Sequence, residues 1–286
     1  MIDNLLSTLL DLKIRYISIK ETVKVWYRNK NTNYRMYSLN EVRNKFKKSE
    51  TVFILGGSES INDVTEKQWN YIAKHDSFGM NWWPVHEFVP TYYQTAFPVD
   101  PNFRKRLEDA ISKRKKDYND TIFFLSDRVI KRGMHPRLLK EFFSENPLCC
   151  SYKYPERILI KDRNYFIKED FKRGIVYRGH LNVILYLLME LGYKNIVLIG
   201  IDLINAVHFY DHYPSMEWQF IEEYSKPVEE KRKEIHLTAT FSKGKMPVDR
   251  YIYALNDYVL KPNNINLYVG SNKSKLYPKI DFYSFK

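Results

Sequence analysis

The fold is decided by residues 191–203, which read L-G-Y-K-N-I-V-L-I-G-I-D-L. The centre of this stretch, from Asn195 to Asp202, is an apolar run that ends in a glycine and an acidic residue. A short apolar run stopped by turn residues predicts a strand buried on both faces, which is typical of a parallel sheet covered by helices. The residues before it, 179–191, predict a largely apolar, buried helix that ends at Gly192.

The same alternation of strand and helix recurs towards the N-terminus. Residues 51–55, T-V-F-I-L, predict a second buried strand, and G-G-S-E-S at 56–60 breaks it before a helix that Thr65 can cap. Further strands are predicted at 77–81, 91–95 and 121–125, with a charged helix at 101–118. Strands that alternate with helices indicate an α/β fold with a mostly parallel central sheet and helices on both faces.

The chain divides into two parts by composition. Residues 1–50 combine aromatic and basic side chains, such as Trp26 and Tyr27, and are interpreted as an N-terminal basic and aromatic extension. Residues 51–286 are expected to form the ligand-binding domain. Within it, residues 205–250 are polar, aromatic and irregular, and their length predicts an active-site lid.

The composition narrows the class of partner and the cellular setting. A formal net charge of +12 favours an anionic partner, either a sugar nucleotide, an acidic glycan, anionic lipid or nucleic acid, without choosing among them. The only two cysteines, Cys149 and Cys150, are adjacent, so they suit neither a zinc site nor a disulfide framework. The N-terminus is too short and too polar in its apolar stretch for a membrane span. We therefore expect a cytoplasmic protein, with a peripheral contact at the inner membrane left open.

Polar residues follow the predicted strands where a ligand site is expected. The turn Gly56, Gly57, Ser58 and Ser60 lies between a strand and a helix, where backbone N–H groups can bind phosphate; a turn that only reverses the chain is the alternative. The turn matches neither the dinucleotide fingerprint nor a Walker loop.

Three further polar residues, Asn81, Gln94 and Asp202, lie at predicted carboxyl ends of strands. Open α/β sheets bind ligands beyond these ends, so we expect the three side chains to gather in one crevice, although each could instead be a buried cap.

In the order of these segments, the chain resembles the bacterial sialyltransferases of glycosyltransferase family forty-two. The turn G-G-S-E-S-I at 56–61 is similar to the family's G-x-G-P-S-L-like turn, and G-M-N at 79–81 stands where the family has R-C-N. The most specific match is the stretch 191–203, which looks like the family's helix end, strand and G-I-D turn. The resemblance covers roughly residues 51–260.

This resemblance implies a Rossmann-like variant of the GT-A fold that binds CMP-sialic acid and inverts the anomeric centre without a metal. Asp202 would hold the ribose or the cytosine side, and Tyr210 matches a family tyrosine that binds the leaving phosphate. By position, the other nucleotide or sugar contacts would be Gly56, Gly57, Ser58, Ser60, Asn81 and Gln94, with Gly179 or His180 in the family's helix-start loop.

One position departs from the family. A second phosphate-binding tyrosine is expected two residues after the aspartate, where this chain has Ile204. His208, Tyr213 or a basic residue would have to replace it, and the donor sugar nucleotide is therefore not fixed by the pattern.

The chemistry of such a transfer can be argued from the residues. Departure of a CMP phosphate needs charge stabilisation, which Tyr, Lys or Arg can supply, and a base for the acceptor hydroxyl. No D-x-D metal motif is present, and we expect neither a metal nor a cofactor besides the CMP-sugar. His236 occupies about the place of the family's catalytic histidine and is the first candidate for the base. The rival candidates are His180, His208 and His212, and Arg173, Arg178 and Lys243 could meet a sugar carboxylate.

The sequence thus predicts a bacterial glycosyltransferase of the sialyltransferase type. It would transfer sialic acid or a related acidic keto-sugar from a CMP-sugar to a cell-surface glycan or glycolipid, as in lipopolysaccharide or capsule biosynthesis. A transferase of another nucleotide-sugar class and a non-enzymatic, basic nucleic-acid-binding protein are the alternatives, although the basic residues form no recognisable reader motif. A homo-oligomer is left open.

Overall fold

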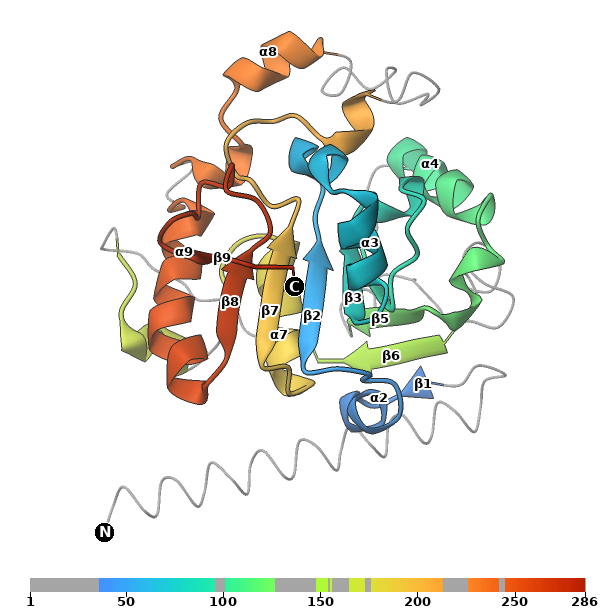
Figure 1. Cartoon of the computed structure of the whole chain (residues 1–286), viewed down its shortest axis with the longest axis horizontal. Coiled ribbons are helices and arrows are strands. Elements are labelled where there is room, and N and C mark those ends of the chain that lie inside the picture. Colours follow the sequence, from blue (N-terminus) through green and yellow to red (C-terminus); the bar gives the residue numbers. More distant parts are fainter. Residues whose placement is uncertain are drawn as a thin grey trace.

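A computed structural model describes residues 36–95, 101–126, 148–153, 155, 165–172, 176–212, 226–241 and 245–285. Over these residues the chain forms one sheet of nine strands in the order β1-β6-β5-β4-β3-β2-β7-β8-β9. Every pair of neighbouring strands in it runs parallel (Figure 1). All carboxyl ends of the strands therefore meet at one edge of the sheet.

The centre of the sheet is made by the two strands that the sequence predicts most clearly. Strand β2, Thr51–Leu55, is buried along its whole length and pairs with β7, Asn195–Ile199. The predicted strands at 77–81, 91–95 and 121–125 are also present. The bounds of the strands are β1 Met36–Tyr37, β3 Asp76–Met80, β4 Tyr92–Gln94, β5 Ile122–Ser126, β6 Leu148–Tyr152, β8 Asn266–Val269 and β9 Asp281–Phe282.

Side chains alternate between two cores, one on each face of the sheet. Val52 and Ile54 of β2 belong to one core, which includes residues of α2, α7 and α9. Phe53 and Leu55 belong to the other core, which includes residues of α3 and α4. Because successive strand residues point to opposite faces, a strand that is apolar throughout needs cover on both sides. The predicted α/β architecture, with a mostly parallel sheet and helices on both faces, is confirmed.

The helices begin and end close to the predicted signals. Thr65 caps α3 through its hydroxyl, which accepts from the backbone N–H of Gln68, as expected for a capping box. The α-helices are α2 Leu39–Lys45, α3 Glu66–Ile72, α4 Pro101–Ser112, α7 His180–Glu190, α8 Val228–Lys233 and α9 Val248–Leu255. Helix α9 continues as a π-turn, η8 Asn256–Leu260, and a 3-10 turn, η9 Lys261–Asn263. The other 3-10 turns are η1 Glu59–Asp63, η2 Trp83–Val85, η3 Asp117–Asp120, η4 Lys168–Lys172, η5 Phe209–His212 and η7 Leu237–Ala239.

Some of the residues assigned to the N-terminal extension belong to the sheet. Met36 and Tyr37 pair with Cys149 and Cys150 of β6, and α2 packs next to them. The division at residue 50 therefore falls after two elements of the folded domain, while residues 1–35 lie outside the described part of the chain. Both cysteines are buried, and burial raises the pKa of the Cys149 thiol to about 12.

The region predicted as a lid is partly helical. Its described residues include η5, α8 and η7, and α9 begins within it at Val248. Figure 1 shows α8 above the carboxyl ends of β2 and β7. Within the described residues, no helix is both long and apolar enough to cross a bilayer.

Candidate functional site

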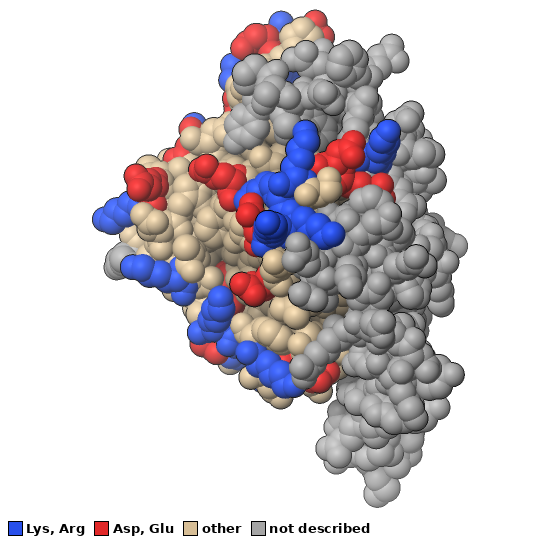
Figure 2. All heavy atoms as spheres, turned by 90° about the vertical axis from the view of Figure 1, so that its right-hand side faces the viewer, with Lys and Arg blue, Asp and Glu red and all other residues tan. Residues whose placement is uncertain are grey.

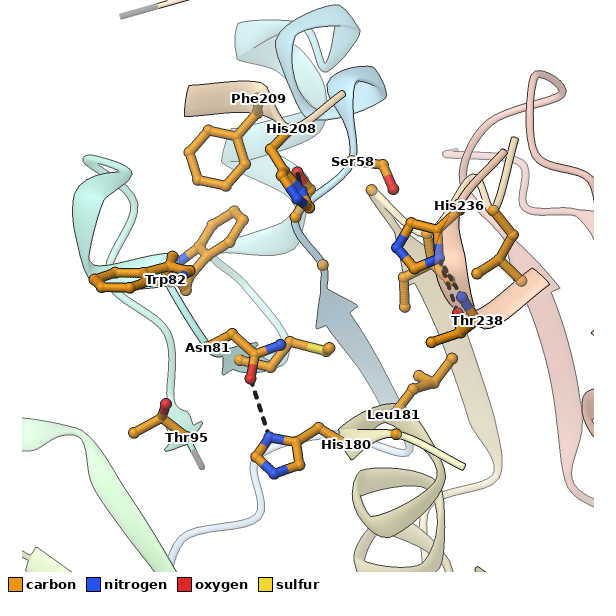
Figure 3. Close-up of a pocket in the computed structure, with 18 of the residues that line it drawn as sticks. Ser58, Asn81, Trp82, Thr95, His180, Leu181, His208, Phe209, His236 and Thr238 are labelled. Carbon is orange, nitrogen blue, oxygen red and sulfur yellow. Dashed lines mark hydrogen bonds between the residues drawn. The ribbon is translucent and has the colours of Figure 1, made fainter. Parts of the chain in front are cut away.

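A cavity of about 380 Å³ opens at the carboxyl ends of the strands. Its walls come from the turns after β2, β3 and β7, from Thr95 after β4, from the start of α7, and from η5 and η7. Figure 3 shows His208 and His236 on either side of Ser58, with Asn81 and His180 across the cavity. The volume lies within the range of small-molecule sites.

Most of the predicted site residues line this cavity. They are Gly56, Gly57, Ser58, Asn81, Gly179, His180, Tyr210 and His236. Three others, Ser60, Gln94 and Asp202, are not among its lining residues. Segments far apart in the sequence therefore converge as expected, and the three exceptions have local structural reasons.

The glycine turn is held by the neighbouring strand. The backbone N–H groups of Gly56 and Ser58 donate to the carbonyls of Ile199 and Gly200 at 2.8 and 2.9 Å. A Cβ on Gly56 would lie 2.3 Å from the Gly200 oxygen, so only glycine allows this close approach. The turn leads into the 3-10 turn η1 instead of an α-helix. These two N–H groups are thus committed to the fold, which corrects the expectation that they would bind phosphate.

Two residues that follow β3 and begin α7 meet across the cavity. Asn81 has a left-handed backbone, with φ of 54°, which aims its side chain away from the strand. His180 Nδ1 lies 3.0 Å from Asn81 Oδ1, so the protonated Nδ1 donates to the amide oxygen. The amide nitrogen of Asn81 is then available as a donor towards a ligand.

Gln94 is the last residue of β4, and its side chain turns below the cavity. It is 4% exposed and its amide nitrogen hydrogen-bonds the hydroxyl of Tyr152 on β6. The next residue, Thr95, lines the cavity in its place. Alternation along the strand explains this one-residue difference.

Asp202 and Ser60 lie behind the glycine turn. Ser60 Oγ donates to Asp202 Oδ1 at 2.7 Å, and the backbone N–H of Asp202 donates to Ser58 Oγ at 3.2 Å. Burial raises the pKa of the Asp202 carboxyl, and the hydrogen bonds from Ser60 oppose this rise. Both residues line a second cavity of about 620 Å³, which also includes Ile204 and Arg232. The two cavities therefore share the Ser58 turn as their wall.

The side of the cavity formed by η5 carries Tyr210 and His208. Their rings stack with centroids 4.9 Å apart, and both residues line the cavity. His208 Nδ1 lies 3.3 Å from the Gly57 carbonyl, which can only accept, so Nδ1 carries the proton of the neutral ring. Burial lowers the pKa of His208. Of the predicted substitutes for the tyrosine missing at Ile204, His208 lies beside Tyr210, and Tyr213 lies outside the described residues.

His236 projects into the cavity from the segment before η7. Its backbone is extended, with φ −51° and ψ 126°, and Figure 3 shows the ring edge opposite Thr238 turned towards the open space. Burial lowers the pKa of His236 to about 4, and the nearby His208 and Arg178 act in the same direction. At neutral pH the ring is therefore uncharged, as a general base requires. His212, by contrast, lines the second cavity, where its Nε2 lies 2.9 Å from Glu59.

The candidate cations are partly explained as structural. The Arg178 guanidinium donates to the carbonyls of Leu237 and Thr240 at 2.8 and 2.9 Å, and so fixes the segment that carries His236. Arg173 and Lys243 lie outside the described residues.

The apolar wall of the cavity was not predicted from the sequence. It includes Trp82, Trp83 and Phe209, which are almost fully buried. Aromatic faces of this kind can stack on bases or sugars. The pair Trp82-Trp83 directly after Asn81 is the signal that could have indicated it.

Within the described residues, no group of three or more His, Cys, Asp or Glu side chains is arranged to hold a metal ion. No protein-family model matches the sequence, and no curated protein matches it. Among solved structures, the chain is similar to a crystal structure of a variant of the sialyltransferase CST-II in complex with CMP. The match has 14% identity and a TM-score of 0.46, and it covers 82% of this chain and 86% of that chain. A similarity at this level does not establish a shared function.

Proposed function

We propose that this protein is a glycosyltransferase that takes an acidic sugar from a CMP-sugar and transfers it to a glycan or glycolipid acceptor. The observation that carries the proposal is the convergence of Ser58, Asn81, Tyr210 and His236 on one cavity at the carboxyl edge of the sheet. These are the residues for which the sequence motifs imply nucleotide, sugar, phosphate and base roles. The edge is also where open α/β sheets bind nucleotides.

The cavity offers each group that the transfer needs. The amide nitrogen of Asn81 and the hydroxyl of Ser58 would bind polar groups of the donor, and the Trp82 ring would cover an apolar face. Tyr210, with His208 stacked on it, would stabilise the charge that develops on the leaving phosphate. The uncharged His236 would accept the proton of the acceptor hydroxyl.

The reaction is a direct displacement with inversion. The acceptor oxygen forms a bond to the anomeric carbon while the bond from that carbon to the phosphate oxygen breaks, and CMP leaves with the electron pair. The proton of the acceptor passes to His236. A phosphodiester is a weakly basic leaving group, so the proposal includes no metal ion.

A ligand panel tests the donor class. Thermal unfolding is measured with CMP, UDP, GDP and NAD at equal concentrations, since a ligand that binds only the folded state raises the midpoint. CMP is expected to give the largest rise. A clear rise with another nucleotide and none with CMP would refute the proposal. Product analysis with CMP-sialic acid, CMP-Kdo and a panel of acceptors then identifies the sugar and the linkage.

A different nucleotide-sugar donor is the second candidate, because one residue favours it. Ile204 stands where the family resemblance implies a phosphate-binding tyrosine, and its side chain is 47% exposed beside the second cavity. Nucleic-acid binding has less support. Figure 2 shows Lys and Arg side chains gathered on one face, but Asp and Glu side chains border them.

A further inference from the structure

The ring of His236 has one hydrogen-bonding partner residue, Thr238, among the described residues. Thr238 Oγ1 lies 2.8 Å from His236 Nδ1, and the backbone N–H of Thr238 points at the same nitrogen from 3.3 Å. The two contacts differ in kind. A hydroxyl can donate or accept, whereas an amide N–H can only donate.

This difference decides which protonation states of His236 the site can support. If Nδ1 holds no proton, both Thr238 groups can donate to it, and the proton of the neutral ring sits on Nε2, facing the cavity. If Nδ1 is protonated, only the hydroxyl oxygen can accept that proton. A base that works through Nε2 requires the second arrangement, because Nε2 must have a free lone pair.

The protonated ring makes the same demand more strongly. Once Nε2 has taken a proton from an acceptor, both ring nitrogens are donors, and Nδ1 needs an acceptor. Thr238 Oγ1, at 2.8 Å, is in place to fill that need. The surroundings of the ring otherwise disfavour a positive charge, since burial, His208 and Arg178 all lower its pKa.

We propose that Thr238 is a positioning residue whose hydroxyl accepts the Nδ1 proton of His236, so that Nε2 can remove the proton of the acceptor hydroxyl. This inference rests on the proposed function for its catalytic consequence. In the step itself, the acceptor O–H proton moves to Nε2, the acceptor oxygen bonds to the anomeric carbon, and CMP leaves with the electrons of the broken bond. The Nδ1 proton stays between the ring and Thr238 throughout.

Three variants isolate the hydroxyl. Thr238→Val keeps the shape and the backbone N–H but removes the acceptor, and Thr238→Ser retains the acceptor. Thr240→Val is the matched control, because the Thr240 hydroxyl donates to the Leu237 carbonyl at 2.9 Å and has no recorded bond to His236. CMP affinity and KM for the donor, measured on each full-length protein, show whether the binding site is intact.

The first readout is turnover. Thr238→Val is expected to lower kcat at least about tenfold, within the range that general-base catalysis contributes, with CMP affinity unchanged. Thr238→Ser and Thr240→Val are expected to remain within about twofold of the original protein. A Thr238→Val protein with unchanged kcat would overturn the inference.

The second readout needs no substrate. The pKa of His236 is measured by NMR titration of the ¹⁵N-histidine-labelled protein, with His236→Asn used to assign its signals. Loss of a hydrogen bond from the charged ring should lower this pKa by about one unit or more in Thr238→Val, and not in Thr240→Val. An equal pKa in both would refute the role of Thr238. If CMP does not bind at all, the proposed function fails, but the titration still decides whether Thr238 supports the charged ring.

Discussion

A buried ion pair holds the part of the cavity wall that carries His208 and Tyr210. Lys231 Nζ on α8 lies 2.8 Å from Asp211 Oδ1, with 4% and 6% of the two side chains exposed. The other oxygen of Asp211 accepts from the backbone N–H of His208 at 2.8 Å. The substitution Lys231→Met keeps most of the apolar stem but removes the cation, so the buried carboxylate loses this counter-charge.

The size of the effect follows from burial. Breaking a buried pair by removing one partner costs about 3–5 kcal/mol, whereas exposed pairs contribute about 0–1 kcal/mol. Because Asp211 keeps the hydrogen bond from His208, we expect Lys231→Met to lower the free energy of unfolding by about 3 kcal/mol. If the wall detaches locally before the whole domain unfolds, the same energy weakens CMP binding by up to about 100-fold.

Urea denaturation and CMP titration at pH 7 measure both effects. Lys233→Met, an exposed lysine on the same helix, is the matched control and should change stability by no more than about 0.5 kcal/mol. The double variant Lys231→Met/Asp211→Asn buries neither charge and should cost less than the two single changes combined. A loss below about 1 kcal/mol in Lys231→Met, with unchanged CMP affinity, would refute this account of the wall.

The remaining predictions concern the turn and the histidines. Gly56→Ala should destabilise the fold by about 1–3 kcal/mol in urea denaturation, because its Cβ would lie 2.3 Å from a backbone oxygen, whereas Gly57→Ala, whose Cβ meets only the His208 ring at 3.4 Å, should keep stability and weaken CMP binding; equal stability losses would contradict this. Burial and Arg114 hold the pKa of His86 at about 4 in the folded state, below 6.5 in the unfolded state, so its contribution to stability is complete above pH 6.5 and decreases as the pH falls towards 4, by at most about 3 kcal/mol. His86→Phe should flatten that part of the stability profile, and an unchanged slope would count against it. His236→Ala should abolish turnover while CMP affinity is retained, and if His208→Ala alone abolishes turnover, the base is His208.

Much of the sheet could be predicted because its central strands are apolar without interruption. Runs such as 51–55 and 195–199 can only be satisfied by burial on both faces. The strands that were missed are shorter or less apolar. Strand β6 contains L-C-C-S-Y, and β1 has two residues that pair with it across more than a hundred positions of sequence. Such a pairing leaves no periodic signal in either segment.

The candidate site was predictable where position on the sheet decides it. Asn81 follows a strand end, and its side chain reaches the cavity as expected. Gln94 does not, because alternation turns it towards Tyr152, and a one-residue difference in where a strand ends is beyond sequence patterns. The turn after β7 includes Leu203 with φ of 59°, an uncommon conformation for a bulky residue that no motif indicated. This turn places Asp202 behind Ser58 instead of beside it.

The most direct test of the central claim is a crystal structure of the protein soaked with CMP. The account predicts the nucleotide between the Ser58 turn and Asn81, with its phosphate near Tyr210 and the Nε2 edge of His236 facing the sugar side. Nucleotide density on another surface of the molecule, or an empty cavity at a CMP concentration that saturates binding in solution, would contradict it.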